Sequence, residues 1–527
     1  MKGNISKQVL LLLALTAAFL NIIPLLLVIP AGDAVMNYMQ VDCFSKQLWA
    51  GIYPRWCMDA NGGMGSPAPI FYFPLPFIIP ALFAPLRSFG LTNEAQYLIG
   101  IYLANVTAFL CCTLWLSRIV SSRVAVFCAF LFLFGFYRAE MIARASYAEY
   151  WCVAFLPLLF LYVREACHSR FKNSLKLALI ITICLFCHAP MTLIGLMGAG
   201  LYMLFFNWRV LIELAIATMI AAMISAFHYV PMRLLTHTLN DEMGGVNHWR
   251  RSWVNSFVNQ PQLYADHTWA LIGSSVGLIA VLFAFAVFSY KHSTLPDNVK
   301  REGLCWIVIA SVSLFMMFSL SAPLWHLIEM ISGVATPWRM QALILLALIL
   351  VIAILAEYTW FQNPKTRTGD MLLGAMFFIF SSLFYAGGVD KKSFDIQRRH
   401  ILSQFSTIYF STRDMDKRYR DIELFFKDFI DRPNRQQAEW VQGSGVLKVE
   451  QWDAQGIIIS IHADRAGILR LEHFYYPIWR AILNEAPIAI TPEPISGRMI
   501  IAIPKGDFSL RLAMDYWGML SPAFTKQ

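Results

Sequence analysis

The sequence predicts an α-helical membrane protein that crosses the bilayer many times and carries a β-rich domain at its C-terminal end. The 527-residue chain is 58% hydrophobic and only 14% charged, whereas soluble domains are about one quarter charged. Apolar runs near twenty residues long, each enough to cross a bilayer as a helix, recur over the first three quarters of the chain. The net charge of +9 therefore indicates how the loops are oriented across a membrane rather than nucleic-acid binding.

The first apolar run covers roughly residues 8–30. It exceeds the apolar region of about 7–15 residues that a signal peptide carries, so we interpret it as an uncleaved first span. Lys2 and Lys7 precede it and favour a cytoplasmic N-terminus. Ten later spans are predicted, at residues 95–117, 124–142, 148–163, 177–189, 191–206, 210–230, 269–289, 303–320, 340–360 and 371–387, which makes about eleven spans in all.

The apolar stretch at residues 68–86 is unsuited to a span. It contains Pro69, Pro74, Pro76, Pro80 and Pro85, and each proline inside a helix costs about 3 kcal/mol. We predict a broken helix that lies at the outer interface or dips into it. With this stretch on the outer side, the short basic loops fall in the cytoplasm, as the positive-inside rule requires. The C-terminal part then lies outside.

These patterns divide the chain into three parts. Residues 1–387 form the transmembrane domain, in which residues 31–86 make an elaborate first outer loop. Residues 388–440 are charged and mixed, and we expect a partly helical connector. Residues 441–527 alternate between apolar and polar positions, with Gly, Pro and Asn between the alternating runs. That alternation predicts a small antiparallel β-sandwich. Its expected role is either a lid or spacer over the cavity or the binding of an acceptor through Trp452, Tyr475, Tyr476 and Trp479.

The cysteine and histidine spacings indicate no cofactor. Cys43 and Cys57 share the first loop and either pair in an oxidising compartment or remain free thiols. The segment "CLFCH" at 184–188 matches a haem-attachment pattern, but it ends an apolar span without a second motif, which favours small buried thiols. No H-x-x-x-H or H-E-x-x-H spacing occurs in the sequence, so we predict no metal; a divalent ion at acidic residues is the alternative.

Ionisable residues gather at the predicted outer ends of the spans. Such residues are candidates for a functional site, the alternative being that each anchors a helix end in interfacial water. The first loop supplies Asp33, Arg55 and Asp59, and later outer segments supply Arg138, Arg144, Glu149, His188 and Arg339.

Several short motifs occur in a fixed order along the chain: Asp33, "GIYPRW" (51–56), Asp59, "NGGMGSP" (61–67), "FYFPL" (71–75), "PWR" (337–339) and "FYYPIWRAILN" (474–484). This order resembles the GT-C class of membrane glycosyltransferases, and most closely the bacterial membrane proteins labelled "6-pyruvoyl-tetrahydropterin synthase-related". The resemblance covers most of the chain. It departs at "DAVMNYMQ", where family members often have a histidine shortly after the acid.

The resemblance implies an inverting enzyme of the bacterial inner membrane. It would move a sugar from a polyprenyl phosphate to a glycan, lipid or protein acceptor on the extracytoplasmic face, without nucleic acid. Asp33 would act as the catalytic base, and Arg339, Arg144 and Arg138 would bind the donor phosphate. Substrate-binding residues would be Asp59, Arg55, Tyr53, Glu149, His188 and Tyr72.

Two other functions are considered. A transporter or flippase of a lipid-linked intermediate would need charges near mid-membrane and often an internal repeat, and neither is evident in the sequence. A non-catalytic factor for polysaccharide assembly would tolerate replacement of both Asp33 and Arg339.

Overall fold

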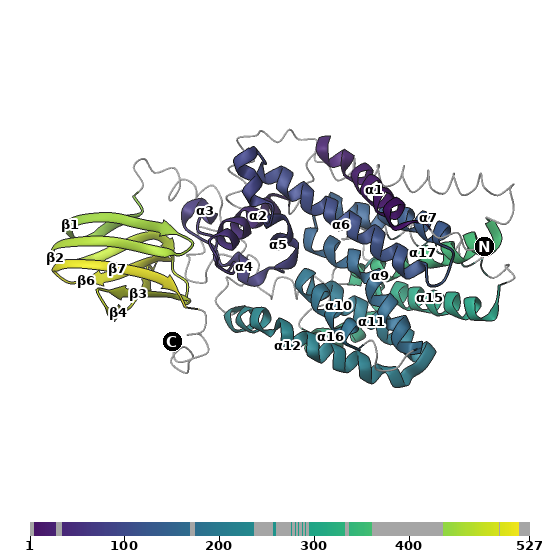
Figure 1. Cartoon of the computed structure of the whole chain (residues 1–527). Coiled ribbons are helices and arrows are strands. Elements are labelled where there is room, and N and C mark those ends of the chain that lie inside the picture. The colour runs from purple at the N-terminus through teal and green to yellow at the C-terminus, as the bar shows by residue number, and fades with distance from the viewer. Residues whose placement is uncertain are drawn as a thin grey trace.

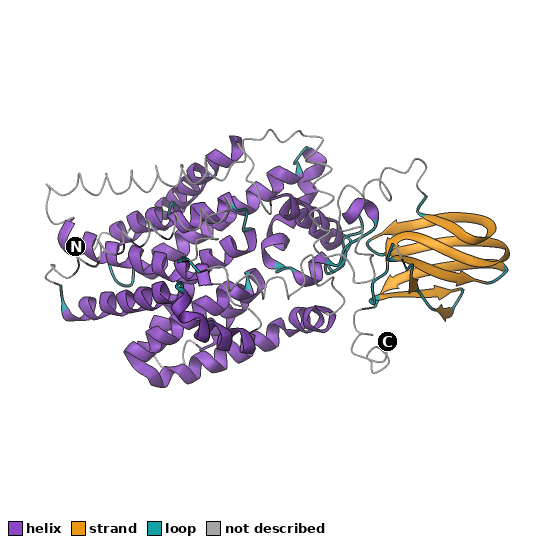
Figure 2. Ribbon diagram, turned by 180° about the vertical axis from the view of Figure 1, so that it is seen from behind, coloured by secondary structure: helices purple, strands orange, loops and turns teal. Residues whose placement is uncertain are grey.

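The computed structural model of the protein is a helical bundle with an antiparallel sheet at one end (Figure 1). Short helices of the first loop lie between the bundle and the sheet, and the view from behind shows the same order (Figure 2). The structure describes residues 5–27, 34–168, 174–236, 257–259, 295–332, 337–360, 436–494 and 496–515, with single positions at 276, 280, 283, 287 and 290.

Most helices of the bundle lie where apolar runs predicted spans, whereas the helix at Ala322–Ser332 falls between two predicted spans. Their bounds are α1 (Lys7–Leu27), α6 (Asn93–Leu116), α7 (Ser122–Leu133), α8 (Phe136–Ala143), α9 (Tyr147–His168), α10 (Ser174–Cys187), α11 (Ala189–Asn207), η2 (Trp208–Val210), α12 (Leu211–Leu235), α15 (Asp297–Met316), η6 (Ser319–Ser321), α16 (Ala322–Ser332), η7 (Pro337–Met340), α17 (Gln341–Leu355) and η8 (Ala356–Trp360). The predicted span at 371–387, and most of that at 269–289, lie outside the described residues.

Six helical stretches in the described part of the chain are long and apolar enough to cross a membrane: Lys7–Leu26, Asn93–Leu116, Ser122–Ala143, Tyr147–Cys167, Ala189–Leu235 and Pro337–Tyr358. The 47-residue stretch Ala189–Leu235 is twice the length that one crossing needs. The backbone of Asn207 leaves the helical region there, at φ −160° and ψ 87°, and separates α11 from α12. A bent pair, Asp297–Met316 with Ser319–Glu329, turns by 90°.

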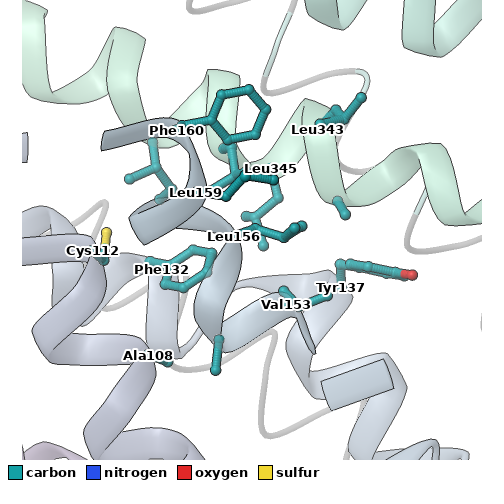
Figure 3. Packing of buried hydrophobic residues seen from close by; sticks show 14 of the residues in the cluster. Ala108, Cys112, Phe132, Tyr137, Val153, Leu156, Leu159, Phe160, Leu343 and Leu345 are labelled. Carbon is teal, nitrogen blue, oxygen red and sulfur yellow. The ribbon is translucent and has the colours of Figure 1, made fainter. Parts of the chain in front are cut away.

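Helix α17 is the centre of the bundle, and each of its side chains from Gln341 to Leu355 is buried. Leu343 and Leu345 lie near Phe160 and Leu159 of α9 (Figure 3). A Cβ at Gly198 of α11 would meet Leu343 Cδ2 at 2.7 Å, so a glycine there lets α11 approach α17 closely. This packing fixes the start of α17, and Arg339 lies just before it.

The first loop is built from short helices: α2 (Ala34–Trp49), α3 (Ala60–Gly63), α4 (Ala68–Phe71), α5 (Leu75–Ala81) and η1 (Ala84–Phe89). The prediction of a broken helix at residues 68–86 is confirmed, because three short elements occupy that stretch. Cys43 and Cys57, left open by the sequence, form a disulfide with their Cα atoms 5.4 Å apart. Gly65 has φ +83°, and a Cβ there would lie 2.4 Å from the Trp56 indole nitrogen.

The C-terminal domain is a single antiparallel sheet of seven strands in the order β4-β3-β7-β2-β6-β5, with β1 paired to β2. The strands are β1 (Ala438–Asp453), β2 (Gly456–Phe474), β3 (Trp479–Leu483), β4 (Ala486–Ile488), β5 (Thr491–Pro492), β6 (Arg498–Ile503) and β7 (Gly506–Met514). The first strand begins before the expected boundary at 441, and of the expected connector 388–440 only its last residues are described.

The expected antiparallel β-domain is confirmed, but its arrangement as a two-sheet sandwich is wrong, because all seven strands belong to one continuous sheet. Strand β2 has 19 residues. Its first half pairs with β7, from Ile457 to Ala463, and its second half pairs with β6, from Gly467 onward. Almost the whole length of β2 also pairs with β1, so the seven strands are hydrogen-bonded into one sheet.

Candidate functional site

The carboxylate of Glu149 holds two arginines that are far apart in sequence. Arg339 donates a 2.7 Å hydrogen bond from Nε to Glu149 Oε2, and Arg144 Nη2 lies 3.4 Å from Glu149 Oε1. The Glu149 side chain is 1% exposed, and those of Arg144 and Arg339 are 10% and 12% exposed. A buried carboxylate of this kind fixes the direction of both guanidinium groups. We call these three side chains the arginine–glutamate bridge.

Arg144 is bonded through each of its nitrogens. Its Nε pairs with Glu140 Oε1, one turn earlier on α8, and its Nη1 donates a 2.7 Å hydrogen bond to Ser146 Oγ. Tyr137, which also lies on α8, donates its hydroxyl hydrogen to Glu149 Oε1. These bonds brace the corner between α8 and α9, where Ala145 has a positive φ of 56°.

Arg339 is only partly bonded. Glu149 takes its Nε, whereas its two terminal nitrogens make no hydrogen bond within the described part of the chain. Neither terminal nitrogen belongs to the buried unpaired atoms, so both remain accessible. A guanidinium held at Nε with two free terminal nitrogens presents the planar pair of donors that phosphate oxygens accept.

Several helices begin around the bridge. Glu149 lies in the first turn of α9, and Arg339 lies in η7, which leads directly into α17. His188 caps α11, because its Nδ1 accepts a 3.1 Å hydrogen bond from the Met191 N–H. Asn37, in the first turn of α2, donates a 2.7 Å hydrogen bond to the Ala145 carbonyl. The amide ends of four helices therefore meet here, and such ends favour anions.

Asp33, the predicted base, lies outside the described residues. The structure describes the chain from the next residue, Ala34, which begins α2. The contact of Asn37 with Ala145 brings the first turn of α2 to the residue that follows Arg144.

Two predicted residues of the first loop, Tyr53 and Arg55, contact α12, and a third, Tyr72, packs on a ring of α5. The Tyr53 hydroxyl lies 3.1 Å from His228 Nδ1, and Arg55 Nη2 donates a 3.1 Å hydrogen bond to the Phe227 carbonyl. The Arg55 guanidinium also stacks over the Tyr53 ring at 4.7 Å. The Tyr72 ring packs against Phe77 at 5.6 Å. These contacts fasten the loop to the bundle.

Asp59 and Arg138 lie in other clusters. Asp59 is exposed and forms an ion pair with Lys46 of α2. Arg138 is completely buried; it donates a 3.0 Å hydrogen bond to Asn105 Oδ1, and its guanidinium lies 3.9 Å over the Tyr150 ring. No contact joins either residue to the arginine–glutamate bridge within the described residues. His188 packs on Phe73 at 4.8 Å and is close enough to interact electrostatically with Arg339 and Glu149.

The sequence predicts Arg144, Glu149 and Arg339 at the same membrane edge, but it does not indicate that Tyr137 and Asn37 support them. The Glu140–Arg144 pair has the i,i+4 spacing of helical ion pairs, which was available as a signal. Among the described residues, no group of three His, Cys, Asp or Glu side chains is placed to hold a metal ion.

Comparison with known proteins identifies no family for this chain. No protein-family model matches the chain, and no curated protein matches its sequence.

Proposed function

We propose that the protein is an inverting glycosyltransferase of the GT-C type, which moves a sugar from a polyprenyl phosphate to an acceptor. The proposal includes about eleven spans in a bacterial inner membrane, a cytoplasmic N-terminus and an extracytoplasmic sheet domain. The observation that carries it is the arginine–glutamate bridge, in which Glu149 directs Arg339 and leaves its terminal nitrogens accessible.

In the proposed reaction, an acceptor hydroxyl attacks the anomeric carbon of the donor sugar. The bond from that carbon to the phosphate oxygen breaks, and the phosphate leaves with the electron pair. Asp33 takes the proton of the attacking hydroxyl, a role that contributes about 10²–10⁴-fold to the rate. Attack from the face opposite the phosphate inverts the sugar configuration.

Arg339 stabilises the leaving group in this scheme. Negative charge grows on the phosphate as the bond breaks, and fixed donors in a site shielded from water stabilise that charge best. Arg144 is bonded to Glu140, Ser146 and Glu149, so its role is to hold Glu149 and to supply positive charge. The helix amide ends around the bridge add to the same field.

The test is a transfer assay with purified protein in lipid vesicles and a panel of polyprenyl-phosphate sugars. We expect Asp33→Asn to lower transfer by at least about 100-fold, with unchanged yield and melting temperature. The control is Asp42→Asn on α2, whose carboxylate pairs with Lys46 and Arg87 and which should keep transfer near the wild-type rate. Transfer by Asp33→Asn at the wild-type rate would refute the role of this residue.

A further inference from the structure

The C-terminal sheet contains a side chain from the first loop within its core. Trp56, from the "GIYPRW" segment, is completely buried and belongs to the same hydrophobic cluster as Ile459, Leu471 and other sheet residues. Its ring lies 5.4 Å from the Tyr476 ring and 6.0 Å from the Trp479 ring. Tyr476 and Trp479 are 0% and 2% exposed, so they hold the loop and do not form an exposed platform for a glycan.

His473 of β2 forms hydrogen bonds with both ends of the first-loop segment 56–63. The indole Nε1 of Trp56 donates a 2.6 Å hydrogen bond to His473 Nε2. Because an indole N–H can only donate, His473 Nε2 must accept, and its ring proton lies on Nδ1. That nitrogen donates to the Gly63 carbonyl at 3.2 Å. Next along the strand, the Phe474 N–H donates a 2.7 Å hydrogen bond to the Met64 carbonyl.

The same segment is fastened to the C-terminal half of α2. Gln47 of α2 is 2% exposed, and its Nε2 donates a 2.7 Å hydrogen bond to the Trp56 carbonyl. Its Oε1 accepts a 3.1 Å hydrogen bond from the Arg55 N–H. The disulfide between Cys43 and Cys57 joins the same two pieces covalently.

The other end of α2 contacts the residue that follows Arg144 of the arginine–glutamate bridge. Asn37 is 2% exposed and bonds the Ala145 carbonyl beside Arg144. Helix α2 has 16 residues, so at about 1.5 Å per residue it spans the distance between these two attachments as one rigid piece.

We propose that Trp56 and His473 are positioning residues, through which the sheet domain holds the first turn of α2 beside the arginine–glutamate bridge. This inference rests on the proposed function only for its catalytic consequence. The coupling of the sheet to α2 is a physical claim that holds for any function of the site.

The coupling is tested by hydrogen exchange of the full-length protein in lipid nanodiscs. His473→Leu leaves the buried Trp56 N–H without its acceptor. We expect amides of residues 55–66, and those of residues 38–41, which bond the carbonyls of the first turn of α2, to exchange about tenfold faster. His473→Gln restores an acceptor and should restore slow exchange in both. The matched control is His462→Leu, the same substitution on the same strand at an exposed side chain, which should leave both segments unchanged.

A second arm asks whether His473 acts through Trp56. Trp56→Phe removes the indole N–H, so His473→Leu should add little further exchange in that background. If the increases in exchange from Trp56→Phe and His473→Leu were fully additive, His473 would not act through its hydrogen bond with Trp56. Faster exchange in the sheet and residues 55–66 with α2 unchanged would overturn the proposal.

The catalytic consequence is tested separately with the transfer assay. His473→Leu should lower kcat about tenfold and leave the KM of the donor unchanged, because Arg339 is held by Glu149 and not by α2; His473→Gln should recover kcat. An equal rise in KM with unchanged kcat would overturn the positioning role. If wild-type protein transfers no sugar, the proposed function fails, whereas the exchange experiment still decides the coupling.

Discussion

Arg339 and Glu149, 190 positions apart in sequence, are joined by a 2.7 Å hydrogen bond between Nε and Oε2. The bond links the start of the central helix α17 to the first turn of α9. Glu149 also contacts Arg144, so one buried carboxylate organises two positive charges. This arrangement leads to two predictions, one for Arg339 and one for Glu149.

Arg339 should bind a phosphate through both terminal nitrogens. We expect Arg339→Lys, which keeps the charge but loses the planar fork, to weaken binding of a polyprenyl phosphate about tenfold, and Arg339→Gln about 100-fold. Titration of each variant in nanodiscs with a polyprenyl phosphate measures these affinities. Arg118→Gln is the control, because Arg118 is exposed and pairs only with Glu165 among the described residues. Equal affinities for Arg339→Gln and Arg118→Gln would contradict the assignment.

Glu149 should be a major source of stability at the site. Glu149→Gln keeps the shape but removes the negative charge shared by two nearly buried arginines. Breaking a buried pair by removing one partner costs about 3 kcal/mol or more, so the thermal unfolding midpoint in detergent should fall clearly. Glu165→Gln removes a carboxylate from a more exposed pair and should cost about 1 kcal/mol or less. Similar midpoints for the two variants would argue against the bridge.

The Cys43–Cys57 disulfide should stabilise the first loop. The cysteines are 14 positions apart, and closing a loop of that length is worth about 3 kcal/mol in the chain-entropy description. The Cys43→Ser, Cys57→Ser double variant should therefore melt at a lower temperature, close to that of the reduced wild type. Cys184→Ser, at a buried free cysteine, is the comparison for a lost sulfur atom. An unchanged melting temperature of the wild type in a reductant would contradict the disulfide.

The sheet domain should lose stability in acid through Glu493. Burial opposes its ionisation, but the Ser496 hydroxyl and the guanidinium groups of Arg470 and Arg498 hold the pKa of Glu493 below its usual value of 4.5. A lowered pKa in the folded state adds stability above the unfolded pKa, and that stability is lost as pH falls through the folded value. The melting difference between wild type and Glu493→Gln should be constant from about pH 5 to 7 and shrink below about pH 4. A melting difference that grows as the pH falls would contradict a lowered pKa of Glu493 in the folded state.

Much of the bundle could be predicted, because an apolar run of span length forces a helix. The run at 95–117 became α6, and the proline-rich stretch at 68–86 broke into short helices as proline chemistry requires. The β-sandwich was wrong for a different reason. Alternation tells which residues face the core but not which strands pair. The change of partner along β2, from β7 to β6, therefore cannot be predicted from its pattern.

The site was predictable where position along a helix decides the outcome. Arg144, Glu149 and Arg339 were expected at one membrane edge because each follows or precedes an apolar run, and they meet. Asp59 was expected in the site from its motif alone, and nothing in the sequence indicates that Lys46 of α2 pairs with it. The burial of Trp56 beneath a strand more than 400 residues later is a tertiary contact that no local pattern carries.

The most direct test of the account is an experimental structure of the protein with a polyprenyl phosphate bound. We predict phosphate oxygens within about 2.7–3.1 Å of the terminal nitrogens of Arg339, with Glu149 still on Nε and the Asp33 carboxylate facing the same space. A bound phosphate that contacts neither Arg339 nor Arg144, or an Asp33 side chain on the opposite side of the membrane, would contradict it.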